Sequence, residues 1–160
     1  MIDLEIINGD INFANGQPVV ISDEQKLVQS LVKILVTPLR ATSVRPGYGT
    51  YLTNILGHAN IPDHIYLTKI RDAIEDAINN LMRQQAEASK RQYVSGGERI
   101  RNLLYVDVVR DPVDQRQLDI YIGVKAGSGS IIEKQFVIAP GQYVTEAYMK
   151  TTPSVGAGGY

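Results

Sequence analysis

Residues 22–37, "SDEQKLVQSLVKILVT", constrain the possible fold more than any other segment. Apolar residues recur at helical spacing and cover most of the helix surface: Leu27, Leu31, Ile34 and Leu35, with Val28, Val32 and Val36 widening the stripe. Ser22 and Gln25 have the capping-box spacing that starts a helix, and Pro38 ends it. A helix this apolar must be buried on most sides, so the rest of the chain has to supply a cover for it.

The remaining segments predict the elements that would cover this helix. A second, longer helix is expected from about Asn60 to Arg91, although its last turns, residues 84–89, have little apolar content and are expected to project or to pack on a partner. Strand-forming runs at 100–109, 118–122 and 131–139 are separated by turn sequences and predict a three-stranded antiparallel meander. Strands at both ends of the chain with helices between them indicate an α+β fold.

Two Asn-Gly pairs, at 8–9 and 15–16, predict an N-terminal β-hairpin or small meander, because both residues accept the positive φ of a tight hairpin turn. The expected organisation is a β-hairpin extension at 1–21, an α+β domain at 22–140 and a partly flexible C-terminal arm at 141–160. We expect the meander to pack against both the buried helix and the long helix. The sequence shows no evident internal repeat.

Composition excludes several classes of function. The formal net charge of -1 gives no general attraction to nucleic acid or to an anionic membrane. Without cysteine there are no disulfides or thiolate metal sites. The acidic N-terminal stretch does not resemble a signal peptide, and no apolar run approaches the roughly 20 residues of a membrane span. We expect a protein that stays in the cell that makes it.

Candidate catalytic and metal-binding residues are few. His58 and His64 have neither of the spacings that place two ligands on one helix face, and with Asp63 they are most simply solvated residues. Glu98 with Asp107 or Asp119 could form an acid pair of the glycosidase kind, but acids are common enough that this selects nothing. The glycines at 96–97 and 127–129 lack the lysine and the context of a phosphate loop, so they predict turns. The sequence therefore predicts no catalytic residue, no metal and no cofactor.

The stretch "RPGYGTYLTNIL", residues 45–56, is unusual for a connector between helices. Gly47 and Gly49 would permit unusual backbone angles and Tyr48 would fill space, while the end of the stretch predicts a short amphipathic helix. Arg45 precedes a proline and is held extended, so it can make a two-pronged contact with a carboxylate. We expect a shaped, non-catalytic surface, with Arg45 pairing to Glu98 across the fold.

The order "SDEQKLVQSLVKILVTP", "RPGYGTYLTNILG", a long helix and "ERIRNLLYVDVV" before a meander resembles the baseplate wedge and sheath-initiator family of contractile phage tails. The resemblance covers about residues 22–138, and the leader "DLEIINGDINFANGQPVVIS" is similar to that of longer members. The family also has a Glu-Pro-Arg signature before its meander; here Glu98 and Arg99 stand without the proline. The resemblance implies that Arg45, Gly47, Tyr48, Gly49, Glu98 and Arg99 define the fold or its contacts.

The resemblance further implies a structural, non-enzymatic protein of the virion, assembled in the host cytoplasm into the tail baseplate in multiple copies around the tail axis. Its expected partners are the tail sheath protein and other baseplate wedge and hub proteins. Sheath recruitment is expected through strand exchange at the free edge of residues 131–138, with residues 142–160 as a possible reciprocal arm. Two alternatives stay open: a peptidoglycan-cleaving hydrolase, since some members carry the label "lysozyme-like", and a small adaptor that uses the same fold.

Overall fold

The computed structural model of the chain describes residues 3–7, 10–56, 62–114, 117–138 and 148–150. Its main helices are α1 (Asp23–Val36), α2 (Leu52–Leu56) and α3 (Asp63–Ser89), and a short 3-10 turn, η1 (Gly96–Glu98), follows α3. The long strands are β7 (Ile100–Arg110), β8 (Leu118–Ala126) and β9 (Ile131–Ile138), joined near the end by β10 (Tyr148–Lys150). The predicted α+β class and the antiparallel meander are confirmed.

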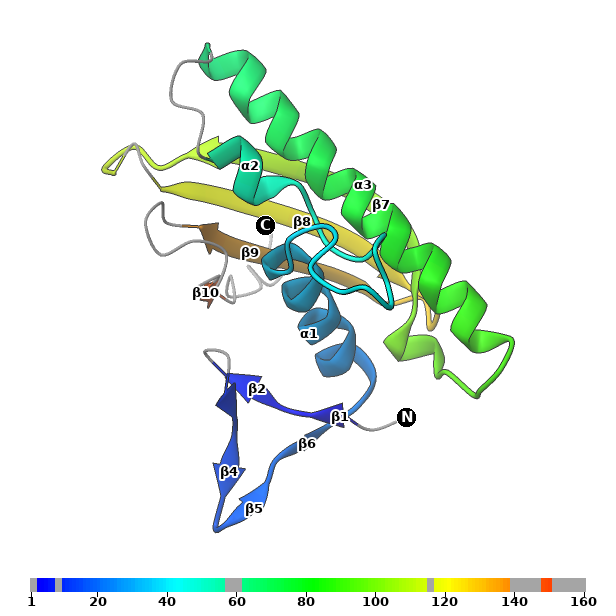
Figure 1. Ribbon diagram of the computed structural model, residues 1–160. Coiled ribbons are helices and arrows are strands. Elements are labelled where there is room, and N and C mark those ends of the chain that lie inside the picture. Colours follow the sequence, from blue (N-terminus) through cyan, green and yellow to red (C-terminus); the bar gives the residue numbers. More distant parts are fainter. Residues whose placement is uncertain (1–2, 8–9, 57–61, 115–116, 139–147, 151–160) are drawn as a thin grey trace, which may run out of the picture.

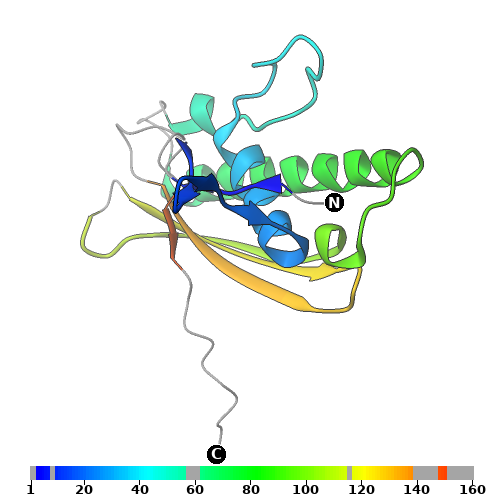
Figure 2. The same cartoon turned by 90° about the horizontal axis from the view of Figure 1, so that it is seen from below.

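The main sheet has the order β10-β9-β8-β7, and every pairing in it is antiparallel. The helices α1 and α3 cover one face of this sheet, as the two perpendicular views show (Figures 1 and 2). Along β8, alternate residues are fully buried, including Leu118, Ile120 and Ile122. The sheet therefore has one face in the core and one face turned to solvent, as the alternation predicts.

One hydrophobic core joins the helices to the sheet. Its largest fully buried side chains come from α1, α2, α3, β8 and β9: Leu27, Leu31, Ile34, Leu35, Leu52, Ile70, Ile74, Ile78, Leu118, Ile120, Ile122 and Phe136. Full burial of one such side chain contributes about 1.5–3 kcal/mol. The apolar stripe of residues 22–37 is thus covered by α3 and by the inner face of the sheet.

The start of α1 differs from the prediction. Ser22 has an extended backbone at the N-cap position but makes no side-chain capping hydrogen bond. Asp23, the first helical residue, instead accepts a hydrogen bond from the Ser95 hydroxyl at 2.6 Å. The predicted capping box is wrong, because the acid at this end is bound by the segment that precedes η1.

Residues 3–7 and 10–21 form a three-armed module of short strands. Its arms are β1 (Asp3–Leu4) with β6 (Val20–Ile21), β2 (Ile6–Ile7) with β3 (Asp10–Ile11), and β4 (Phe13–Ala14) with β5 (Gln17–Pro18). Figure 1 shows the module outside the layers of helices and main sheet, beside α1. Asn15 and Gly16 have φ of 52° and 76°, so the second predicted Asn-Gly turn is confirmed; the first, at 8–9, lies outside the described residues.

A ring of backbone hydrogen bonds closes the centre of the module. The Glu5 amide donates to the Val19 carbonyl (2.8 Å), the Asn12 amide to the Glu5 carbonyl (2.9 Å) and the Val19 amide to the Asn12 carbonyl (2.9 Å). These three residues are equally spaced along the chain, and the arms between them, residues 6–11 and 13–18, both carry a central Asn-Gly. The expectation of no internal repeat is therefore wrong for this segment.

Among the described residues, no helix is long and apolar enough to cross a membrane. His58 and most of the predicted C-terminal arm lie outside the described residues.

Candidate functional site

The loop between α1 and α2, residues 37–50, is held at its base by close backbone contacts. The Thr50 amide donates to the Thr37 carbonyl (2.9 Å), the Leu39 amide to the Thr50 carbonyl (3.0 Å), and Pro38 forms a parallel bridge with Thr50. Gly49 lies in this contact with φ of +119°, and a Cβ there would come within 2.5 Å of the Thr37 carbonyl oxygen. Gly49 is therefore required by the backbone at the base of the loop.

Gly47 has a different environment from Gly49. No atom lies within 4 Å of the place where a Cβ would stand, and its φ is outside the range that favours glycine. The expectation that both glycines permit unusual backbone angles is thus correct for Gly49 and wrong for Gly47. The difference depends on where the loop closes, which spacing in the sequence does not reveal.

The tip of the loop projects on the side of the helices that faces away from the sheet (Figure 2). Residues 40–47 are all exposed, and Val44 is 88% exposed. Tyr48 packs partly against the core; burial raises the pKa of its hydroxyl, and the nearby Arg45 guanidinium acts in the opposite direction. The loop therefore has a fixed base and a tip whose side chains face solvent.

Arg45 and Glu98 do not form the predicted pair. Arg45 is exposed, and no hydrogen bond or ion pair within the described part of the chain joins it to Glu98. Glu98 is 4% exposed and lies 3.3 Å from the Lys26 ammonium nitrogen. The carboxylate is thus held by α1, whose first turns lie beside η1.

The turn η1 connects α1, α3 and the turn that follows β8. The Gln85 side chain donates to the Glu98 carbonyl (3.2 Å) and accepts from the Ile100 amide (2.9 Å), so α3 binds both ends of this junction. The Arg99 side chain is exposed, while its carbonyl accepts from the Gly127 amide at 2.8 Å. Within the polar end of α3, which was expected to project or to meet a partner, Gln85 is used inside the protein, whereas Glu87 is exposed. Neither Lys26 nor Gln85 was identified from the sequence as a residue that binds this turn. For Lys26, the available indication was a lysine on a largely apolar helix.

The two glycine-rich turns lie against each other. The Ser128 amide donates to the Gly96 carbonyl (3.1 Å), and a Cβ on Gly127 would come within 3.0 Å of that same oxygen. With the start of α1 they line a shallow depression of mostly small and polar residues: Ser22, Asp23, Glu24, Gln25, Ser95, Gly96, Gly97, Ser128 and Ser130. Asp23 and Glu24 make this helix end unsuited to an anion, so the depression has no character of a phosphate site.

The candidate acids are not brought together as a catalytic pair would be. Glu98 is buried beside Lys26, whereas Asp107 is exposed on β7 and alternates there with the buried Val106. Asp119 lies on the same solvent face, since it is paired in register with Val109, and accepts from the Gln117 side chain at 3.3 Å. The acid before the meander and the acids of the sheet thus face different sides of the fold.

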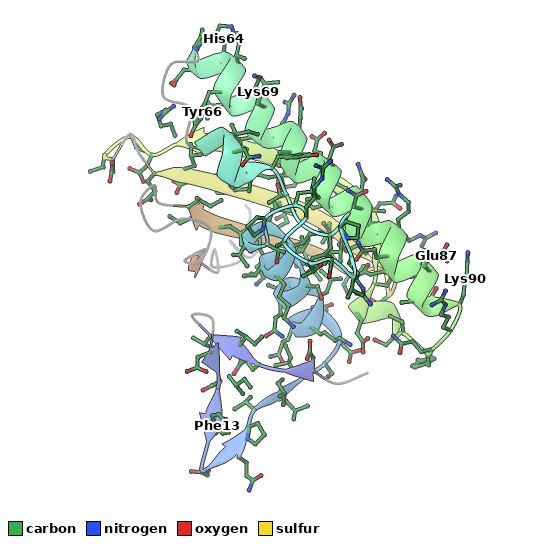
Figure 3. All side chains as sticks on the ribbon, in the orientation of Figure 1. Phe13, His64, Tyr66, Lys69, Glu87 and Lys90 are labelled. Atoms are coloured by element: carbon green, nitrogen blue, oxygen red, sulfur yellow. The ribbon has the colours of Figure 1, made fainter. Side chains whose placement is uncertain are left out.

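The start of α3 has a structural ion pair. Asp63 accepts from the Arg110 guanidinium at 2.6 Å, and the guanidinium carbon lies 5.2 Å from the centre of the Tyr66 ring. Burial raises the pKa of Tyr66, with Arg110 lowering it and Asp63 raising it. His64 lies on the exposed first turn (Figure 3). No group of three or more His, Cys, Asp or Glu in the described ranges could hold a metal ion.

The edges of the main sheet differ from the prediction. Tyr148, Met149 and Lys150 of β10 pair with Val137, Phe136 and Gln135 of β9, so the chain itself covers part of the edge that was expected to be free. In the described part of the chain the edge strands of this sheet are the short β10 and β7, and β10 leaves residues 131–134 of β9 uncovered. The longest open edge is that of β7, which has β8 as its neighbour.

The orientation of the backbone groups on β7 follows from one hydrogen bond. The Asp111 amide donates to the Gln117 carbonyl at 2.9 Å, and the register is regular from Tyr105 to Arg110. In an antiparallel ladder, alternate residues direct their N–H and C=O toward the same neighbour. Val106, Val108 and Arg110 therefore direct these groups outward, away from β8.

One comparison with known proteins bears on the fold. No protein-family model and no curated protein matches the chain. Among solved structures, one described as a "putative tail lysozyme" from Geobacter sulfurreducens superposes with a TM-score of 0.58 and 17% sequence identity, covering 76% of this chain and 94% of that one. At this identity the likeness establishes a shared fold, and that fold is one found in a tail-related protein.

Proposed function

We propose that the protein is a structural, non-enzymatic component of a contractile tail baseplate. In this role it connects the baseplate to the sheath and nucleates sheath assembly by exchanging a β-strand with sheath subunits. It would lie in the virion in several copies around the tail axis, in contact with wedge and hub proteins as well as with the sheath. The tail-related fold supports the setting, and the unpaired edge of β7 supports the mechanism.

The edge of β7 is the observation that carries the mechanism. Eleven residues, Ile100–Arg110, form a strand with one neighbour in the described sheet. Unpaired N–H and C=O groups along such an edge can take a further strand, whose backbone hydrogen bonds give affinity while alternate side chains give specificity. Because β10 covers residues 135–137 of β9 and leaves a short open edge at 131–134, the incoming strand would add beside the longer edge of β7.

A proline at Val108 tests this mechanism. Val108 directs its N–H outward, so Val108→Pro removes a donor from the free edge and leaves the ladder to β8 intact. Val108→Ala is the matched control, because it shortens the same half-buried side chain and keeps the N–H. Baseplates carrying each variant would be mixed with sheath protein, and sheath would be measured by electron microscopy.

We expect sheath to grow normally from Val108→Ala and to fail on Val108→Pro, with both variants folded by circular dichroism. Normal sheath growth on a folded Val108→Pro variant would refute strand addition at β7. Failure of both variants would refute it as well, because the loss would then follow the side chain.

A peptidoglycan hydrolase is the second candidate, because the structural neighbour is described as a tail lysozyme. The buried Glu98 is the acid that such an enzyme would use, although it lies 3.3 Å from the Lys26 ammonium nitrogen and faces away from the sheet acids. Purified protein would be incubated with peptidoglycan and the released sugar fragments measured. Release that depends on Glu98, tested with Glu98→Gln, would favour the hydrolase over the structural role.

A further inference from the structure

The three-armed module directs its apolar side chains to the outside. Among its described residues only Ile21 is buried, whereas six large apolar side chains are exposed: Leu4, Ile6, Ile7, Ile11, Phe13 and Val20. Phe13, on the arm made by β4 and β5, is 60% exposed (Figure 3). Apolar groups concentrated in this way on a small unit are typical of a surface that is covered by another protein.

The module is also held firmly to the body. The Gln29 side chain donates to the Leu4 carbonyl (2.9 Å) and accepts from the Ile6 amide (2.8 Å), and Gln29 is itself buried. The Lys33 ammonium lies 3.0 Å from the Asp3 carboxylate. Together with the central ring of hydrogen bonds, these contacts present the arms in a fixed arrangement, which lowers the entropy lost on binding.

The charge of the module indicates which kind of partner surface it favours. Residues 1–25 contain no lysine or arginine, and the module carries Asp3, Glu5 and Asp10. Asp3 is offset by Lys33 and Glu5 is hydrogen-bonded by the Asn12 side chain, while Asp10 is exposed and accepts a local hydrogen bond from the Ile11 amide. An apolar surface with acidic charge favours a partner surface that is apolar and basic.

The loop at 37–50 of this same protein has that character. No aspartate or glutamate occurs from residue 25 to residue 62, and the exposed tip carries Arg40, Arg45 and the apolar Val44. Its base is fixed by the contacts around Gly49. Loop and module project from different parts of the molecule, the loop from the helix layer and the module from the end of α1 (Figures 1 and 2).

We propose that the three-armed module of one copy docks on the loop tip of a second copy. Because the two surfaces differ, the contact is head-to-tail, and repeating it gives a ring if the rotation closes. The contact itself is inferred from the two surfaces, and only the placing of such a ring around a tail rests on the proposed function. Two small surfaces give a weak contact, strengthened when copies are held side by side.

Charge exchange between the two surfaces tests the proposal. Sedimentation velocity of the full chain from about 10 to 500 µM, at about 50 mM salt, should show a mass that rises with concentration and falls when salt is raised to about 500 mM. Asp10→Lys or Arg45→Glu should each weaken association about tenfold or more, because each places like charges across the contact. An equimolar mixture of the two variants should associate as the wild type does, since every contact between unlike copies again joins opposite charges.

Two controls separate a docking effect from a folding effect. Val113→Ser, at a 94% exposed position distant in sequence from both surfaces, should associate normally, whereas Phe13→Ser should not. Circular dichroism checks that each variant is folded. A constant monomer mass over the whole range would overturn the proposal, as would charge variants that associate like the wild type or a mixture that fails to recover. A monomer that still nucleates sheath would refute self-docking alone, while self-association without sheath growth would refute the sheath role alone.

Discussion

Alanine at Gly49 should destabilise the protein far more than alanine at Gly47, although both glycines belong to the same short motif. Gly49 has φ of +119°, and its Cβ would stand 2.5 Å from the Thr37 oxygen and 2.8 Å from the carbonyl carbon and oxygen of Pro38. All of these are backbone atoms, so relief requires the base of the loop to open. Gly47→Ala meets nothing within 4 Å and needs no unusual φ.

The expected magnitudes follow from these two environments. Holding a non-glycine residue at such a φ costs about 1–3 kcal/mol, and relieving the overlap costs about 1–3 kcal/mol more. For a chain of this size 1 kcal/mol changes Tm by about 2–4 °C, so Gly49→Ala, at a total cost of about 2–6 kcal/mol, should lower Tm by about 4–24 °C. Gly47→Ala should be neutral or stabilise by up to about 1 kcal/mol, because alanine restricts the unfolded chain.

Urea denaturation followed by circular dichroism measures both variants, with scanning calorimetry for Tm. A similar m-value for each variant and the wild type would show that the change lies in the free energy of unfolding. The reasoning is refuted if Gly49→Ala is as stable as the wild type, or if Gly47→Ala loses as much stability as Gly49→Ala. The pair therefore separates a backbone requirement from a general intolerance of the loop to change.

Three further predictions concern charged and polar contacts. Lys26→Met should cost about 2–4 kcal/mol in urea denaturation, because the Lys26 and Glu98 side chains are 15% and 2% exposed. Lys90→Met removes an ion pair whose side chains are 68% and 65% exposed and should leave the stability unchanged, so equal losses in the two variants would contradict this account. Gln29→Leu should speed hydrogen exchange at Ile6 with little change in the amides of β8, and uniform exchange throughout the chain would argue against a local tether. Burial is the largest single influence on the pKa of Asp3 and raises it, but the hydrogen bonds from Lys33 and the Leu4 amide and the charges of Lys33 and Lys26 together outweigh burial, so the net pKa is lowered. This contact is therefore fully present above about pH 4 and is lost as pH falls through the lower folded value. Exchange in residues 3–7 should rise there in the wild type and depend less on pH in Asp3→Asn.

Much of the fold could be predicted because its main elements have strong local patterns. The apolar stripe of α1, the periodicity of α3 and the alternation along β8 each need burial on a particular face, and a single sheet covered by two helices provides it. Pro38 and the Asn15–Gly16 pair fix a helix end and a turn through their own backbone geometry. These properties depend on neighbours in the chain, so they can be predicted without knowledge of the tertiary contacts.

The candidate surfaces were predicted only in part. The sequence indicates that residues 45–49 and 98–99 define the fold or its contacts. It does not reveal that Lys26 is the cation beside Glu98, because a lysine on an apolar helix can equally extend to solvent. The requirement at Gly49 and the freedom at Gly47 arise from where Thr37 and Pro38 return to the loop. Contacts between residues far apart in the sequence leave little trace in local pattern.

The sequence by itself determined the class of fold, the two main helices, the meander and the absence of thiol chemistry, since each follows from composition or from short-range spacing. The tertiary structure decided which edge of the sheet stays open, because the pairing of β10 with β9 joins segments whose order along the chain does not specify the register between them. It also decided that the N-terminal strands form three arms around a ring of backbone hydrogen bonds. Backbone amides are the same in every residue except proline, so which of them pair across a fold is set by how the whole chain packs.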